Sequence, residues 1–139
     1  FLRRCGADIT RVRKMFRDDM DSYRAKAEAV RMAEVYRKEF AIAECPSDVE
    51  SPTVLAAQAA NELLDISGIK ASFVLTIYEG KIYMSARSID EVNVQIVAEK
   101  LGGGGHINAA GAQFDHTDME EAIKALKLTI DKMIEEGDI

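Results

Sequence analysis

The sequence has few of the residues that crosslink small domains or bind metals in them. Its two cysteines, Cys5 and Cys45, stand far apart and show no CxxC spacing. This usage supports neither a disulfide scaffold nor a zinc site, and it fits a reducing compartment. The chain also has only two histidines, His106 and His116, and neither stands in the cluster of Asp and His that a two-metal site needs.

Long apolar runs are absent, so the sequence predicts no membrane span, and its start, FLRRCGADIT, lacks the apolar core of a signal peptide. Residues 1–40 hold 11 Lys and Arg against 7 Asp and Glu, a net charge of +4, whereas residues 41–139 hold 7 against 17, a net charge of −10. An acidic body argues against broad nucleic-acid binding, which depends on neutralising many phosphates. A small phosphate ligand held by one or two cations remains compatible with this charge.

The chain of 139 residues is 47% hydrophobic, which predicts one globular body with a real core. Residues 8–37 show helical periodicity in two parts: one begins at a candidate N-cap, Asp8, and the second runs from Met20 to Tyr36. The apolar stripes of these helices need a partner, so we expect this segment to dock on another surface.

The remainder, residues 38–139, alternates strand-like and helical patterns. Candidate helix starts follow Ser51 (with Pro52 at the first position), Asp90 and Asp118. Short apolar runs predict strands at 39–45, 72–79, 81–88 and 111–116, the second and third joined as a hairpin near Glu79-Gly80. This order predicts an α/β fold with a mixed sheet of about four to five strands and flanking helices.

Four consecutive glycines precede a histidine in the stretch LGGGGHINAAGAQ, residues 101–113. A flexible linker is a poor explanation, because a helix ends and a strand begins within about ten residues. A structural turn explains one or two glycines, since a glycine commonly ends a helix. A ligand loop explains all four, because backbone N–H groups without side chains can cradle an anion and His106 adds a further donor.

A second anchor is the run SARS, residues 85–88, which closes a predicted strand. Arg87 is the only arginine after Arg37, and a guanidinium is suited to bidentate contact with phosphate. An ion pair with Asp90 or Glu91 is the ordinary alternative for a strand-end arginine. We favour the phosphate interpretation because the same strand leads into the helix that delivers the glycine run.

These motifs carry a family resemblance. The run LGGGGHINAAGAQF resembles the GGGH-xx-AAG signature of the DHH-associated domain, the C-terminal substrate-binding lobe of DHH-family phosphoesterases. SARS followed by NVQIVAEKLGGGGH is similar to the arginine strand and loop-entry helix of the same lobe. LRRCGADITRVRKMF resembles the segment that leaves the catalytic lobe. The resemblance covers essentially the whole chain and is closest to the membrane-anchored cyclic-di-AMP phosphodiesterases of the GdpP type.

The resemblance implies a division of labour. Residues 1–37 would be the helical linker from a DHH catalytic lobe of the same full-length chain, and residues 38–139 the substrate-binding domain. Two manganese ions and the catalytic residues would belong to the other lobe, with no cofactor in this chain. The substrate site implied by the resemblance comprises Ser85, Arg87, Ser88, Gly103, Gly104, Gly105, His106, Asn108, Ala109 and Ala110.

Three functions follow as hypotheses. The first is the substrate lobe of a cyclic-di-AMP phosphodiesterase, in the cytoplasmic part of a membrane-anchored bacterial protein. The second is the lobe of a short-oligonucleotide exonuclease, and the third a non-catalytic dimerisation module whose glycines serve as a turn. The partners implied are the DHH lobe, a cyclic dinucleotide or short oligonucleotide, and a second copy of the chain. Tyr83 and Phe114 are the aromatic candidates for stacking on a base.

Overall fold

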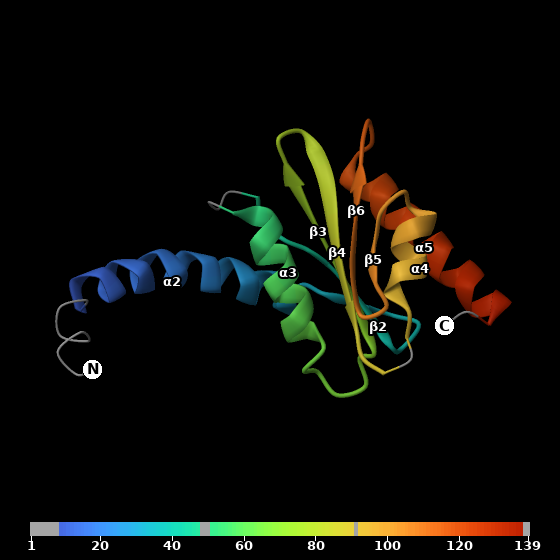
Figure 1. Cartoon of the computed structure of the whole chain (residues 1–139), viewed down its shortest axis with the longest axis horizontal. Helices are drawn as coiled ribbons and strands as arrows, with labels where there is room; N and C mark the ends of the chain where they lie inside the picture. The colour runs from blue at the N-terminus through green and yellow to red at the C-terminus, as the bar shows by residue number, and fades with distance from the viewer. Residues whose placement is uncertain (1–8, 48–50, 91, 138–139) are drawn as a thin grey trace.

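The structure is a computed structural model, and it describes residues 9–47, 51–90 and 92–137. A long helix, α2 (Ile9–Arg31), precedes a mixed six-stranded sheet, and three further helices pack against that sheet (Figure 1). The helices are α3 (Pro52–Leu63), α4 (Val94–Lys100) and α5 (Met119–Glu136). The strands are β1 (Glu34–Tyr36), β2 (Phe40–Glu44), β3 (Ala71–Tyr78), β4 (Lys81–Ser88), β5 (Gly104–His106) and β6 (Ala109–Phe114).

The predicted α/β class with a mixed sheet is confirmed, with more strands than expected. The strand order is β1-β2-β3-β4-β6-β5, in which β2 and β3 run parallel and every other neighbouring pair runs antiparallel. The predicted hairpin near Glu79-Gly80 is confirmed, because Tyr78 pairs with Lys81 and both turn residues adopt positive φ. No helix in the described segments is long and apolar enough to cross a bilayer.

The sheet buries a separate hydrophobic cluster on each face. Figure 1 shows α2 and α3 on one side of the sheet and α4 and α5 on the other. Alternate residues of β3 serve the two clusters: Phe73 packs with the helices α4 and α5, and Val74 packs under α3. The alanines of α3 allow a close approach, so the Ser72 hydroxyl donates a 2.6 Å hydrogen bond to Ala60 O.

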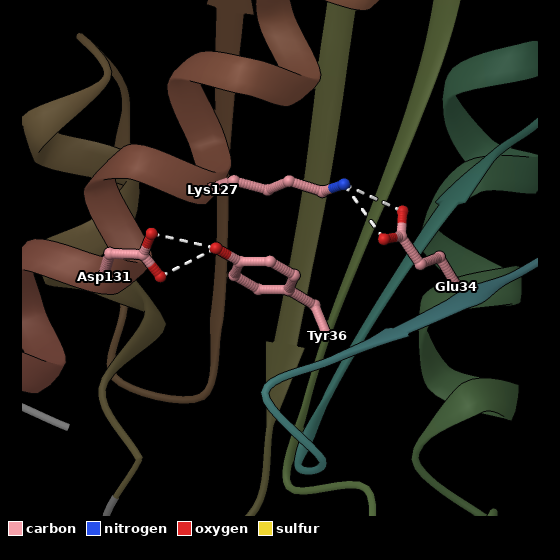
Figure 2. A network of polar contacts seen from close by, with 4 residues as sticks. All are labelled: Glu34, Tyr36, Lys127 and Asp131. Carbon is pink, nitrogen blue, oxygen red and sulfur yellow. Dashed lines mark hydrogen bonds and ion pairs between the residues drawn. The ribbon is translucent and has the colours of Figure 1, made fainter.

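The prediction of helix up to residue 37 was wrong for its last residues. The helix ends at Arg31, and residues 34–36 form the edge strand β1. Two side-chain contacts join this strand to α5 (Figure 2): the Tyr36 hydroxyl lies 2.8 and 2.9 Å from the carboxylate oxygens of Asp131, and Lys127 Nζ donates to both Glu34 oxygens at 3.0 Å. These long-range contacts hold a strand that the local sequence pattern does not specify.

The predicted helix starts have mixed outcomes. Asp118 is confirmed, because its carboxylate accepts from Glu121 N at 2.8 Å. The prediction that Asp90 caps the next helix is wrong, because Asp90 adopts φ +56 and the N-cap of α4 is Asn93. Ser51 precedes the helix as predicted, with Pro52 at its first position, but its side chain makes no capping hydrogen bond. Asp8 lies outside the described residues.

Candidate functional site

The first two glycines of the run end a helix. Leu101 is the C-cap of α4, and Gly102 follows in the left-handed region at φ +91. The N–H of Gly102 donates to Glu99 O at 3.1 Å, and that of Gly103 donates to Ala98 O at 2.7 Å. This pair of bonds is the Schellman arrangement, which satisfies the last carbonyls of a helix. Both N–H groups are therefore engaged within the protein.

Two glycines allow the run to lie close against β6. A Cβ on Gly103 would collide with Gly111 O and with Ala112. A Cβ on Gly105 would lie 2.5 Å from the Cα of Ala110, and Gly105 also adopts φ +147. The segment predicted as a loop thus contains a short strand, β5, because glycine lets the backbone approach closer than any other residue allows.

Gly104 is under neither constraint. Its φ lies outside the left-handed region, and a Cβ placed on it meets no protein atom within 4 Å. Cβ positions alternate along a strand, so the vacant Cβ position of Gly104 lies on the opposite face from those of Gly103 and Gly105. The folded chain itself therefore gives no reason for a glycine at this position.

The opposite face carries Arg87 and His106 in one row. Arg87 of β4 pairs with Ala109 of β6, and Ala109 pairs in turn with His106 of β5. Directly paired residues share a face of the sheet, so the two side chains leave the same surface about 10 Å apart at their Cα atoms. The neighbouring Ala110 is buried in the cluster of α4 and α5, which places Arg87 and His106 on the opposite side of the sheet. On that side α3 packs against β3 and β4, and the half-buried and exposed residues of β4, β6 and β5 beside α3 form the surface that we call the open face.

The adjacent row is made of small residues. Ser85, Gly111 and Gly104 pair across β4, β6 and β5 in the same way. All three are half-buried, and Ser85 makes no side-chain hydrogen bond within the described part of the chain. Sequence reasoning missed Gly111, although the alternation of Ala109, Gly111 and Gln113 along a strand places these residues on one face.

Arg87 is half-buried and lacks a carboxylate partner. Its Nη1 donates to the carbonyl of Ala86 at 2.8 Å, and no acidic residue in the described ranges lies within ion-pair distance. The alternative pairing with Asp90 is therefore not formed, and Glu91 lies outside the described residues. A half-buried guanidinium without a counter-ion is a strong attraction for an anion.

Ser88 and Asn108 connect the two strands that carry this face. The Ser88 hydroxyl donates to Val92 O at 2.6 Å, with Ile107 O as a second acceptor at 3.2 Å. The Asn108 amide donates to Ser88 Oγ at 2.9 Å and to Asp90 O at 3.2 Å. Both side chains therefore form hydrogen bonds that hold the turn between β5 and β6 in place.

The two aromatic candidates for base stacking lie on opposite faces of the sheet. Phe114 packs against the cluster of α4 and α5, whereas Tyr83 lies on the open face two residues from Ser85. Among the described residues, no group of three or more His, Cys, Asp or Glu could hold a metal ion. The arrangement suits recognition of an anion by one cation, one exposed histidine and a bare backbone.

The fold and this face describe an α/β domain built to present a loop and an arginine at one surface. Comparison with known proteins identifies it further: the model of the DHHA1 domain matches residues 38–132. The match covers well over half of the chain, and the chain belongs to the DHHA1 domain family.

Two curated relatives are named as cyclic-di-AMP phosphodiesterases. PdeA of Listeria monocytogenes serotype 1/2a (strain 10403S) is 40% identical over 132 residues, which are 94% of this chain and 20% of the relative. GdpP of Bacillus subtilis (strain 168) is 40% identical over 140 residues, which cover 99% of this chain and 21% of the relative. The chain thus spans about a fifth of the length of the curated relatives that it matches.

Solved structures agree on the fold. An exopolyphosphatase-related protein from Bacteroides fragilis superposes with a TM-score of 0.72 at 24% identity, over 81% of this chain and 34% of that one. The exonuclease RecJ bound to manganese superposes with a TM-score of 0.59 at 18% identity, over 82% of this chain and 28% of that one. At these identities, the likeness concerns the fold alone.

Proposed function

We propose that this chain is the substrate-binding lobe of a DHH-family phosphodiesterase that hydrolyses cyclic-di-AMP. The observation that carries the proposal is the row of Arg87 and His106 beside the sterically free Gly104, on a sheet face that α4 and α5 do not cover. The names of the two curated relatives support the choice of substrate.

The roles of the residues follow from their surroundings. Arg87 would neutralise a phosphate of the substrate by a charge-assisted pair of hydrogen bonds, with His106 donating from the far side of Ala109. Gly104 would let the phosphate or ribose lie directly against the backbone of β5, an edge strand whose outward N–H groups have no strand partner. Ser88 and Asn108 would hold the turn between β5 and β6 in place.

Hydrolysis itself would take place at a separate DHH lobe. The described residues offer no cluster for manganese, so in this proposal the metal ions and the attacking hydroxide belong to that lobe. Residues 1–37 would connect the two lobes, and residues 38–139 would orient the substrate. We place the whole protein at a bacterial membrane with this lobe in the cytoplasm, where a second copy of the chain is a further candidate partner.

The test is kinetic, in the full-length protein that carries the DHH lobe. Replacing Arg87 by Ala should lower kcat/KM for cyclic-di-AMP at least about tenfold, because a charged hydrogen-bond pair is lost. Lys124→Ala, on the exposed side of α5, is the matched control and should leave kcat/KM within about twofold. Equal small effects of both changes would show that Arg87 is not a substrate contact.

A further inference from the structure

The open face continues from the row of Arg87 and His106 toward the β3–β4 hairpin. Along β4, Tyr83, Ser85 and Arg87 alternate with the buried residues Met84 and Ala86, so all three belong to the open face. Residues two apart on a strand advance by about 7 Å, which puts the Cα of Tyr83 about 13 Å from that of Arg87. The intervening row is the one made of Ser85 and two glycines. A row of small residues therefore lies between the arginine and an aromatic ring on this face.

Tyr83 forms an aromatic pair with Tyr78 beyond this row. Its ring centroid lies 6.2 Å from that of Tyr78, with the ring planes tilted by 59°. Tyr78 is 40% exposed and Tyr83 is half-buried, and neither hydroxyl has a hydrogen-bond partner within the described ranges. The Tyr78 ring thus packs against one side of the Tyr83 ring, and part of the half-buried Tyr83 surface stays accessible.

Gln113 lies directly beside this ring. It pairs with Tyr83 across β4 and β6, shares its face, and is exposed. Its Nε2 donates to Asp115 Oδ1 at 2.9 Å, and Lys81 Nζ lies 3.9 Å from the same oxygen. Because a carboxylate only accepts hydrogen bonds, Asp115 fixes which end of the amide is nitrogen. The Oε1 atom and one remaining N–H of Gln113 are left for a ligand.

We propose that Tyr83 and Gln113 form a subsite for an adenine base, an inference that rests on the proposed function. The Tyr83 ring stacks on the base of a nucleotide whose phosphate is held at Arg87. The Gln113 amide then accepts from the exocyclic amino group of adenine and donates to the neighbouring ring nitrogen, a bidentate pattern that guanine does not offer at the same edge. This face thus selects the base as well as binding the phosphate.

The experiment measures kcat/KM of the full-length protein on cyclic-di-AMP and on cyclic-di-GMP. Tyr83→Ala should lower kcat/KM for the adenine substrate about tenfold or more, while Tyr83→Phe, which keeps the ring, should stay near the unmodified value. Gln113→Ala should reduce the preference for adenine over guanine about tenfold. Gln95→Ala, on α4 at the opposite face, is the matched control and should leave that preference unchanged.

The outcomes separate this inference from the proposed function. If Arg87→Ala is deleterious but Gln113→Ala leaves the ratio of the two substrates unchanged, the adenine subsite is wrong and phosphate binding stands. If Arg87→Ala has no effect, the proposed function itself fails. Melting temperatures of all variants exclude unfolding as the cause, and an equal loss of activity in Tyr83→Phe and Tyr83→Ala would overturn the stacking role.

Discussion

Each glycine of the run 102–105 is subject to a different physical constraint. Gly102 supplies the left-handed residue that ends α4, and Gly103 and Gly105 have no room for a Cβ. Gly104 has room and an ordinary φ. Helix termination and close packing against β6 therefore account for Gly102, Gly103 and Gly105, and the proposed ligand contact accounts for Gly104.

Cys45 should behave as a protected thiol. It is 3% exposed, and burial raises the pKa of its thiol to about 11. At pH 8 about one thousandth of this thiol would be ionised, so alkylation by iodoacetamide should be far slower than that of a model thiol. In a Cys5→Ser variant, mass spectrometry should detect labelling of Cys45 only after denaturant is added. Rapid labelling of the folded variant would contradict the buried position.

Sequence reasoning at the residue scale proposed both ends of the candidate site, Arg87 and His106, and two residues of its small-residue row, Ser85 and Gly104, but it missed Gly111. Arg87 and His106 could be proposed because Arg87 is the only arginine after Arg37 and His106, one of two histidines, directly follows four glycines. Gly104 could not be distinguished from its neighbours, since the difference depends on which Cβ positions β6 occupies. That information is three-dimensional.

The contacts between β1 and α5 lead to a prediction at the scale of elements. Asp131→Ala would remove the acceptor of Tyr36 and the partner of Arg37, whose Nη2 lies 2.9 Å from Asp131 Oδ1. We expect a loss of about 1–2 kcal/mol in the free energy of unfolding, measured by urea denaturation. Glu28→Ala, which breaks an exposed pair with Arg31, should cost clearly less, because solvent screens an exposed ion pair. Equal costs would show that these contacts do not hold the edge strand.

Two short strands, β1 and β5, were not predicted from the sequence, each for a physical reason. The β1–β2 connection places Arg37 and Lys38 at φ +55 and +69, a conformation usually signalled by Asn or Gly. Glycine-rich β5 has low strand propensity and forms because its backbone packs closely on β6. The longer strands and α5 were predictable because their apolar periodicity matches their burial.

On the scale of the whole molecule, the described residues carry the proposed substrate face but no group of His, Cys, Asp or Glu that could hold a metal ion. We therefore predict that the purified chain alone does not hydrolyse cyclic-di-AMP in the presence of manganese. Chromatographic detection of the linear dinucleotide and of AMP would measure this directly. Sustained turnover, at a rate that scales with chain concentration through purification, would contradict the division between two lobes.

The helix α2 presents exposed apolar side chains that the proposed two-lobe arrangement would use. Its last turns pack on α3, with Ala29 buried and Lys26 Nζ 3.2 Å from Glu62. Farther back, Met20 and Tyr23 are 41% and 59% exposed, on a helix that extends away from the sheet (Figure 1). This agrees with the proposed linker, which would use such side chains against the DHH lobe or a second copy.

The central claim is that Gly104 serves a ligand, and paired measurements on one substitution test it. Gly104→Ala should shift the melting temperature by no more than about 2 °C, because the new Cβ meets no protein atom within 4 Å. In the full-length protein, it should nevertheless lower kcat/KM for cyclic-di-AMP at least about tenfold. Gly105→Ala is the matched control and should lower the melting temperature by on the order of 5–10 °C, since its Cβ collides with Ala110. A Gly104→Ala protein that melts normally and turns over its substrate at the unmodified rate would contradict the account.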